Sequence, residues 1–440
     1  MTATLLSSRR LGATAFVGDP HGVLLAGPLA SEGPETLGAH LTRLGPPPDL
    51  APARILATLG EGGIEGRGGG GFPVWRKLQA AIDAPGEPVL IVNCSESEPG
   101  SRKDRVLCSL RPHLVLEGAA ALARAIGARS VTLHLHREST EAALALRAAA
   151  HERPPGHDEP MWGLSRGPGG YIAGEASAVA RFAHEGVARP TFGGIPLARR
   201  GPSGRPTVVS NAETAAQVAV LLRFGVARMQ ELGSAGHPGS SLVTLTGAVN
   251  RPGTVVELVG PTTIGELLAG VAGIAAPPLA VLVGGYCGTW LPAEVAWHTL
   301  MEPDALAAVG ASRGCGLIGV LPPGACGVSE TARLAAYMAT QSAGQCGPCV
   351  HGLPALAEHL QELARGRGGR RNLRQIERTV ESLPGSGACR HPDGVAHLTR
   401  SALEAFGPDV VQHRRRKPCP GVDHGPVFVT TPGREEGWLR

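Results

Sequence analysis

A run of glycines between residues 66 and 73 is the first segment whose composition points to chemistry. It reads Gly-Arg-Gly-Gly-Gly-Gly-Phe-Pro, and the spacing GxGxxG is met at Gly66, Gly68 and Gly71. Residues without a Cβ atom let backbone N–H groups approach a phosphate or a flavin closely. A helix that begins at Pro73 would add a favourable dipole. The segment therefore predicts a loop that binds a phosphate or a flavin.

The surroundings of the loop bear on that prediction. Lys77 lies one turn into the expected helix and can direct a compact positive charge at the same ligand. An ordinary dinucleotide fingerprint follows a strand, whereas residues 55–59 have a helical pattern, so that motif is not predicted. A flexible glycine loop without a ligand is the alternative.

A second polar segment begins at Asn93, directly after the apolar run 89–92. The run has the composition of a buried strand, and ligands of open α/β sheets bind at the carboxyl ends of such strands. Asn93 can hydrogen-bond the edge of an isoalloxazine or nicotinamide ring, and Glu96 can contact ribose hydroxyls. The alternative is a solvated loop in which Lys103 and Asp104 pair at the surface.

Two further segments, 171–176 and 205–214, each open a predicted helix. A helix start offers unpaired backbone N–H groups to an anion, so both segments are candidate contacts for a phosphate. Glu213 and Thr214 are equally compatible with a plain helix start.

Cysteine spacing predicts a metal or cluster site near the carboxy terminus. Cys346 and Cys349 form a C-x-x-C pair, and Cys389 follows 40 residues later at another helix start. Such a pair places two thiolates within reach of one metal ion or cluster, and a third cysteine can complete the site. Zinc is the main rival to an iron–sulfur cluster. A redox dithiol is less favoured, because the pair does not follow the first strand of a βαβ unit.

Composition excludes several classes of protein. The chain has 440 residues and is 42% hydrophobic, which excludes a disordered chain and indicates several domains with cores of their own. Aromatic residues make up only 3% and the net charge is +4, so nucleic acid is not an expected partner. No segment approaches the ~18 apolar residues that span a bilayer. Nine cysteines do not indicate a disulfide framework, so we expect a cytoplasmic protein that is not integral to a membrane.

Lysine and asparagine are rare in this chain. Only three lysines and four asparagines occur, namely Lys77, Lys103, Lys417, Asn93, Asn211, Asn250 and Asn372. Three of these seven lie between residues 77 and 103, which adds weight to that region as a binding site.

The elements that position these residues fall into three groups. Apolar runs alternate with amphipathic stretches up to about residue 232, which predicts an α/β domain with a parallel sheet. Residues 240–294 predict a compact module of β-hairpin, helix and strand. Beyond residue 328, only helical periodicity is found. The predicted boundaries are 1–50 for a lead-in, 51–232 for the α/β domain, 240–294 for the module, 328–407 for a helical bundle and 408–440 for a flexible tail.

Four motifs in this order resemble those of the NADH-binding flavoprotein subunit of respiratory complex I. This is the family of NADH-quinone oxidoreductase F subunits, with relatives in NAD-linked hydrogenases and formate dehydrogenases. The family's GRGGAGFPxGxK, NADESEPGxxKDR, YxxGEE and GxPTxxNNxET are matched at 66–77, 93–105, 171–176 and 204–214. The resemblance covers roughly residues 50–407.

The resemblance implies a Rossmann-like flavin-binding domain, a ubiquitin-like SLBB α+β domain at 240–294 and an iron–sulfur-binding helical bundle. The implied cofactors are FMN, NADH and an iron–sulfur cluster, [4Fe–4S] or [3Fe–4S]. Hydride would pass from NADH to FMN, and single electrons would leave through the cluster to a ferredoxin or another electron-transfer subunit. The implied cofactor-binding residues are Gly66, Arg67, Gly68, Gly70, Phe72, Lys77, Asn93, Tyr171, Gly174, Glu175 and Asn211. Glu96 is the implied catalytic residue, and Cys346, Cys349 and Cys389 are the implied metal ligands.

Several positions depart from the family's motifs. Family residues that contact flavin or NADH are replaced by Ser95, Ala176, Ser210, Leu78, Gln79 and Ala80, the last three where aromatic residues usually follow the lysine. The losses predict slow NADH oxidation of weak affinity. The alternative is a degenerate, non-catalytic subunit that acts as an interaction scaffold.

Ala343 is the departure with the largest chemical consequence. The family's SCGQCxPC reads SAGQCGPC here, so one of four cluster ligands is missing. Three thiolates can hold a [4Fe–4S] cluster with an outside fourth ligand, a [3Fe–4S] cluster, or nothing, in which case they are buried as small hydrophobic residues. Cys326 and Cys419 are the candidates for a substitute.

Overall fold

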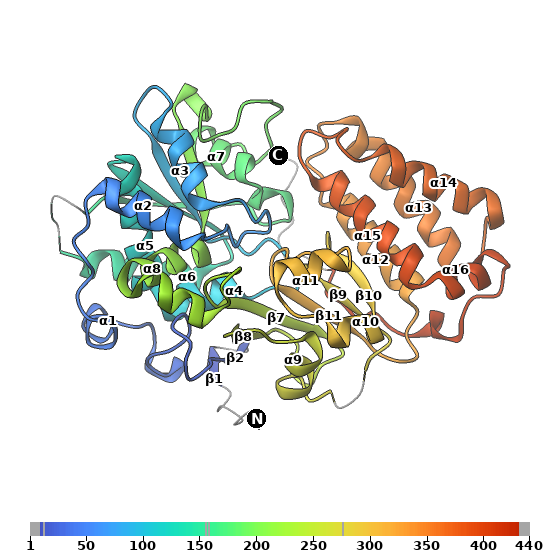
Figure 1. Ribbon diagram of the computed structural model, residues 1–440. Coiled ribbons are helices and arrows are strands. Elements are labelled where there is room, and N and C mark those ends of the chain that lie inside the picture. The colour runs from blue at the N-terminus through green and yellow to red at the C-terminus, as the bar shows by residue number, and fades with distance from the viewer. Residues whose placement is uncertain (1–8, 12–13, 155, 157–158, 275–276, 431–440) are drawn as a thin grey trace.

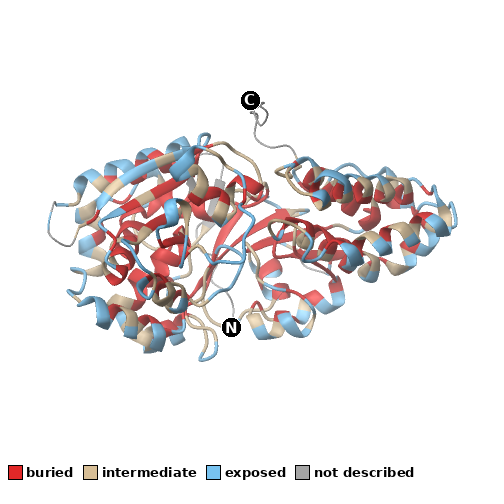
Figure 2. Ribbon diagram, turned by 90° about the horizontal axis from the view of Figure 1, so that it is seen from above, coloured by how far each residue is buried: buried red, intermediate tan, exposed pale blue. Residues whose placement is uncertain are grey.

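The computed structural model describes residues 9–11, 14–154, 156, 159–274 and 277–430. Figure 1 shows three bodies in a row: an α/β unit in blue and green, a central sheet mostly in yellow-green and yellow with β1 and β2 in blue, and a helical bundle in orange and red. Buried residues gather along the inside of each body, and exposed residues cover the outside (Figure 2).

The α/β unit is built on a parallel sheet of four strands in the order β5-β4-β3-β6. Its strands are β3 (Val89–Asn93), β4 (Ser130–His136), β5 (Met161–Gly167) and β6 (Thr207–Asn211). Its helices are α1 (Leu37–Leu44), α2 (Pro52–Gly62), α3 (Val74–Ile82), α4 (Lys103–Leu110), α5 (Pro112–Ile126), α6 (Thr140–Glu152), α7 (Ala176–Glu185) and α8 (Ala212–Leu232).

Helices cover both faces of this sheet. Side chains alternate along a strand, so Leu90 and Val92 join the large core that contains α5 and α8, while Ile91 points the other way and packs with Val179 of α7. The predicted α/β domain with a parallel sheet is confirmed, and it has the two-sided covering of a doubly wound fold. The helical pattern at 55–59 is also confirmed, since it belongs to α2.

A mixed sheet of seven strands lies beside this unit, in the order β1-β2-β8-β7-β11-β9-β10. Its strands are β1 (Arg9–Leu11), β2 (Thr14–Val17), β7 (Ser241–Gly247), β8 (Thr254–Leu258), β9 (Ala280–Val283), β10 (Thr289–Pro292) and β11 (Leu317–Leu321). Short helices α9 (Ile264–Gly270), α10 (Ala293–His298) and α11 (Pro303–Ala308) connect them.

The hairpin, helix and strand expected between 240 and 294 are present as β7, β8, α9 and β9. The sheet extends further than expected, because β11 pairs in parallel with β7 and β2 pairs in parallel with β8. Thr263 and Glu266 form a reciprocal capping box that fixes the start of α9.

The bundle consists of α12 (Gly327–Thr340), α13 (Leu353–Ala364), α14 (Gly369–Ser382), α15 (His391–Ala405) and α16 (Gly407–Arg414). The flexible tail expected from residue 408 is wrong up to residue 430. Phe428 is 2% exposed, and its ring lies 5.8 Å from that of Trp290, because two large aromatic rings gain from mutual burial. Residues 431–440 lie outside the described residues.

Within the described residues, no single helix is both long and apolar enough to cross a membrane. One pair, α4 with α5, meets the length and composition criteria together, but the two helices are bent by 96°.

Candidate flavin and cluster sites

The carboxyl ends of β3 and β6 bring two of the rare asparagines side by side. Asn93 and Asn211 are direct partners in the parallel pairing of the two strands. The side-chain N–H of Asn93 donates to the carbonyl of Gly174 at 2.9 Å, and that of Asn211 donates to Asp104 Oδ2 at 2.9 Å. Three segments that are distant in sequence, 93–105, 171–176 and 204–214, therefore meet at one edge of the sheet.

A cavity of about 290 Å³ opens at this edge. Predicted site residues that line it are Arg67, Gly68, Asn93, Glu96, Tyr171, Gly174, Glu175, Asn211 and Cys389. Residues that line it and were not singled out as ligands from the sequence include Glu98, Lys103, Asp104, Cys287, Cys315 and His391.

Four of the predicted cofactor-binding residues do not line this cavity: Gly66, Gly70, Phe72 and Lys77. The N–H of Gly66 donates to the carbonyl of Phe72 at 2.9 Å, which closes the glycine loop and leaves its tip exposed. Lys77 Nζ donates to the carbonyl of Val209 at 3.1 Å, and burial lowers the pKa of this lysine. Its charge is directed at the middle of β6 rather than into the cavity.

The lining of the cavity is rich in polar groups, as a ligand such as FMN requires. At Gly174 and Gly68 the backbone packs closely against Ser97 and Asn211, so a side chain at either position would need its neighbours to move. Buried polar atoms also lack a partner within the described protein, namely Ser95 Oγ and Glu98 Oε1. Buried groups of this kind are normally hydrogen-bonded, which indicates a polar ligand.

Arg67 connects the glycine loop to the central sheet. Its backbone N–H donates to Thr214 Oγ1 at 2.8 Å, and its guanidinium donates to Ser241 Oγ at 3.3 Å and to the carbonyl of Pro238. The side chain is buried, and burial lowers its pKa. Arg67 therefore fixes the position of the loop beside the cavity.

The helix starts of α4, α7 and α8 are capped by the protein's own side chains. Glu96 Oε2 accepts the N–H groups of Asp104 and Arg105, at 2.8 and 3.2 Å. Glu175 accepts N–H groups at the start of α7, and Asn211 accepts one at the start of α8. Three of the predicted cofactor contacts thus have a structural role as well, and part of the N–H groups at the helix starts in 171–176 and 205–214 are already occupied by protein side chains.

Lys103 belongs to a buried ionic cluster beneath the cavity. Its Nζ lies 2.9 Å from Asp104 Oδ1 and 3.0 Å from Glu213 Oε2, and the side chain is 2% exposed. Burial alone would lower the pKa of Lys103, but the two carboxylates outweigh it and raise the pKa. The alternative of a surface pair is wrong, because the loop is covered by the central sheet: Glu213 Oε1 accepts the N–H of Leu242 at 2.9 Å.

Glu98 is the site residue that sequence reasoning missed most clearly, although it lies two positions after Glu96. Its Oε2 accepts the N–H of Tyr286 at 3.1 Å. Burial raises the pKa of Glu98 to about 8, even though this N–H opposes the rise. At neutral pH the protonated carboxyl can donate a hydrogen bond into the cavity.

Replacing Glu98 with glutamine should change how stability depends on pH. The folded carboxyl keeps its proton up to about pH 8, whereas an ordinary glutamate loses it near 4.5. The stability due to this proton is complete below pH 4.5 and is lost as the pH rises to 8. Glu98→Gln should therefore gain stability relative to wild type across that window, measured as melting temperature in a pH series. Glu61→Gln, at an exposed glutamate, is the control, and parallel curves for Glu98→Gln and wild type would contradict the assignment.

The predicted cluster cysteines lie where the bundle faces the α/β unit. Cys346 and Cys349 come just before α13, and Cys389 precedes α15. Burial, and then the neighbouring Cys346, raises the pKa of Cys349 to about 12. Cys389 lines the cavity described above, which places the predicted cluster beside the predicted flavin.

Hydrogen bonds hold the cluster loop against the cavity wall. Gln341 Oε1 accepts the N–H of Tyr171 at 3.1 Å, and Gln345 donates to the carbonyl of Pro190 at 2.6 Å. The ring of Tyr171 lies 5.6 Å from that of His391. The two predicted sites are therefore joined by packed side chains rather than by solvent.

Neither candidate for the missing fourth ligand reaches these cysteines. Cys326 precedes α12 and Cys346 follows it, and a helix of 14 residues is about 21 Å long. Cys419 lies with Cys326, because their sulfur atoms are within 4.8 Å of each other. The alternative that Cys326 or Cys419 supplies the fourth cluster ligand is therefore wrong.

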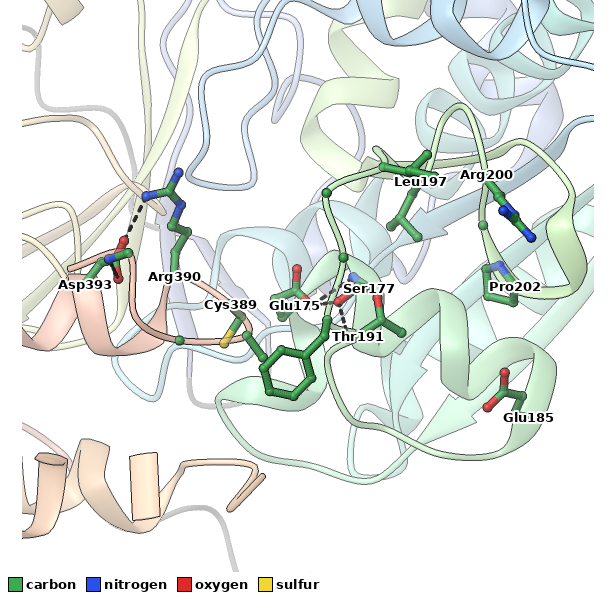
Figure 3. A pocket seen from close by; sticks show the side chains of 18 residues that line it. Glu175, Ser177, Glu185, Thr191, Leu197, Arg200, Pro202, Cys389, Arg390 and Asp393 are labelled. Carbon is green, nitrogen blue, oxygen red and sulfur yellow. Dashed lines mark hydrogen bonds and ion pairs between the residues drawn. The ribbon is translucent and has the colours of Figure 1, made fainter. Parts of the chain in front are cut away.

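A second cavity, of about 740 Å³, adjoins the first. It lies between the start of α7, the loop 191–202 and the segment 385–393, and Glu175, Cys389 and Arg390 line both cavities. Figure 3 shows Cys389 approaching from the bundle toward Glu175 and Ser177, with Arg390 paired to Asp393. This space is open for a second ligand next to the first.

These features define a class of protein: an α/β flavoprotein coupled to a cysteine-ligated cluster. Residues 59–220 match the model of the Nuo51 FMN-binding domain, and residues 329–413 match that of the NADH-ubiquinone oxidoreductase-F iron-sulfur binding region. The chain is 31% identical over 389 residues to an NADH-quinone oxidoreductase F subunit of Rhizobium meliloti, covering 84% of this chain and 91% of the relative. It is 31% identical over 373 residues to the F subunit of the Escherichia coli NADH-quinone oxidoreductase, covering 81% and 83%.

A solved structure is also similar. An NAD+-reducing [NiFe]-hydrogenase in the H2-reduced state superposes with a TM-score of 0.74 at 29% identity, covering 84% of this chain and 63% of the hydrogenase chain. The chain belongs to the family of NADH-quinone oxidoreductase F subunits. The resemblance found in the motifs is confirmed, as are the FMN and iron–sulfur cofactors and the NADH-linked oxidoreductase class.

Proposed function

We propose that this chain passes electrons from NADH, through FMN in the 290 Å³ cavity, to a cluster held by Cys346, Cys349 and Cys389. The observation that carries the proposal is the position of Cys389, which lines the flavin cavity and is also a predicted cluster ligand. FMN, when bound, accepts a hydride from nicotinamide and releases electrons one at a time.

The residues that line the cavity have different roles. Gly68 and Gly174 allow close packing of the wall, and the buried carboxyl of Glu98 offers a proton to the edge of the bound ring. Asn93 and Asn211 are held by their partners and order the edge of the sheet. We assign the adjoining 740 Å³ cavity to the nicotinamide dinucleotide, and Glu96 remains the predicted catalytic residue.

We assign the contacts with partner proteins to the parts of the chain outside the α/β unit. We infer that residues 240–294 form the SLBB module and that the acceptor is a ferredoxin or another electron-transfer subunit in the cytoplasm. The support is that the curated relatives are named as subunits. The alternative of a non-catalytic scaffold is not favoured, since both the FMN-binding and the iron–sulfur regions are matched.

Replacing Gly68 with leucine should weaken FMN binding at least tenfold. The new side chain would start 3.3 Å from Asn211 Cβ and occupy the cavity. Loss of the ring's contacts should cost at least ~1.4 kcal/mol, a tenfold rise in the dissociation constant. Flavin fluorescence quenching on titration of FMN into apo-protein measures it. Gly60→Leu, in α2 with nothing within 4 Å of a Cβ, is the control; equal affinities for the two variants would contradict the site.

Reduction of the bound flavin by NADH should be slow and saturate weakly. Leu78, where the family has an aromatic residue, is fully buried in the core and cannot stack on a ligand. Ser95 is too short to replace the carboxylate of the family's Asp, and its Oγ has no hydrogen-bond partner among the described residues. Stopped-flow absorbance of FMN-loaded protein mixed with NADH is the measurement. Fast reduction that saturates at low micromolar NADH would show that these losses do not weaken the site.

A further inference from the structure

Two thiols and one imidazole from three separate segments converge inside the helical bundle, at the far end of α12 from the predicted cluster ligands. Cys326 lies directly before α12, His413 is near the end of α16, and Cys419 follows in the carboxy-terminal segment. Their ligand atoms all lie within 4.8 Å of one another, and all three residues are buried. In the part of the chain that the structure describes, no other group of three or more His, Cys, Asp and Glu side chains is this close.

The hydrogen bonds of His413 fix which ring nitrogen is free to bind a metal. Nδ1 lies 2.9 Å from the carbonyl of Ala364 and 3.2 Å from that of Leu363, and carbonyls only accept, so Nδ1 carries the proton. Nε2 accepts the N–H of Cys419 at 3.3 Å, so it presents a lone pair. A backbone carbonyl behind the ring is the usual outer partner of a metal-binding histidine.

The sulfur atoms of Cys326 and Cys419 both lie within 4.8 Å of a ring nitrogen of His413. Cys326 Sγ lies 3.4 Å from His413 Nε2 and accepts the N–H of Ser329 at 3.3 Å, at the start of α12. A helix start with a donated N–H favours a thiolate, which is the form that binds metals. Cys419 is 6% exposed and is not in a disulfide.

We propose that Cys326, His413 and Cys419 bind one Zn²⁺ ion, with a water molecule as the fourth ligand. Zinc takes sulfur and nitrogen ligands tetrahedrally, at about 2.3 Å for Zn–S and 2.0–2.1 Å for Zn–N, which places ligand atoms about 3.5–3.8 Å apart. The observed spacing needs only a small adjustment to meet this. In the described residues no fourth Cys, His, Asp or Glu atom joins the group, which leaves the last position to water.

The site would anchor the carboxy-terminal segment. It connects the start of α12 with α16 and with the chain that runs on to Phe428, which packs on Trp290 of the central sheet. Zinc bound here therefore acts as a structural link between the bundle and the central sheet, and it shares no ligand with the flavin and cluster sites.

Metal analysis of the full-length chain tests the proposal. The variant Cys346→Ser/Cys349→Ser/Cys389→Ser removes the competing thiols, and after zinc loading and desalting it should retain about one Zn²⁺ per chain. Adding Cys326→Ser or Cys419→Ser should weaken zinc binding more than about 100-fold in competition with a chromophoric chelator, since even the loss of an outer-shell partner costs 10–100-fold. Adding Cys108→Ser, at a buried cysteine of α4, should leave zinc binding unchanged.

Cobalt provides a readout that needs no variant at the proposed ligands. Co²⁺ added to the same triple-serine chain should give the intense visible bands of a tetrahedral ion with a thiolate charge-transfer band, and Zn²⁺ should displace it. Zinc retention that is equal with and without Cys326 and Cys419 would overturn the proposal. So would a Cys326–Cys419 disulfide found by mass spectrometry in protein purified under reducing conditions.

Discussion

Lys103→Met should be the most destabilising single substitution at the flavin site, lowering the free energy of unfolding by about 3–5 kcal/mol. The lysine neutralises Asp104 and Glu213, which lie 2.9 and 3.0 Å from Nζ and are themselves buried. Methionine fills a similar volume, so the loss comes from leaving two carboxylates in the interior without a cation. Their charge could then be removed only by taking up protons.

Urea denaturation followed by circular dichroism measures the effect as a fall in the first transition midpoint. Lys417→Met is the matched control, because Lys417 is exposed and its loss should change stability by no more than about 0.5 kcal/mol. The triple variant Lys103→Met/Asp104→Asn/Glu213→Gln removes all three charges and should recover part of the loss. Equal midpoints for Lys103→Met and Lys417→Met would show that the cluster contributes no stability.

Ala343→Cys should convert the cluster from a three-iron to a four-iron form. The motif and its downstream partner supply three thiolates, Cys346, Cys349 and Cys389, and α12 keeps Cys326 away from them. Three thiolates suffice for a [3Fe–4S] unit, whereas a fourth protein donor favours [4Fe–4S]. Ala343 is half-buried in the loop between α12 and Cys346, so a thiol there can reach the same cluster.

Iron and sulfide analysis with electron paramagnetic resonance distinguishes the two forms. Anaerobically purified wild type should contain about three irons per chain and show a signal when oxidised, and the variant should contain about four and show a signal only when reduced. Ala307→Cys, at an exposed alanine of α11, controls for an added thiol. A variant with the same iron content and spectrum as wild type would contradict the shared site.

The sequence predicted the layers and the edge of the sheet where the site lies. The apolar run 89–92 with a polar successor implied a strand that ends in a ligand site, and Asn93 does pair with Asn211 at that edge. Local pattern suffices here, because strand alternation and helix periodicity are properties of neighbouring residues.

Features that depend on long-range packing were not predictable in the same way. Lys103 looks like a surface residue until β7 covers it through the bond between Glu213 and Leu242. Phe428 has no local signal for burial, since its partner Trp290 is 138 positions away in the chain. The convergence of Cys326 with His413 likewise requires the bundle to fold first.

The central claim is that one chain holds a flavin and a cluster in electronic contact. The most direct measurement is anaerobic reduction by NADH of protein reconstituted with FMN, iron and sulfide, with flavin absorbance and the paramagnetic signal of the cluster followed together. The account predicts that flavin bleaching is followed by a change of the cluster signal in the same chain, and that Cys389→Ser abolishes the second change while leaving the first. Protein that remains colourless after reconstitution, or a cluster signal that does not respond when the flavin is reduced, would contradict it.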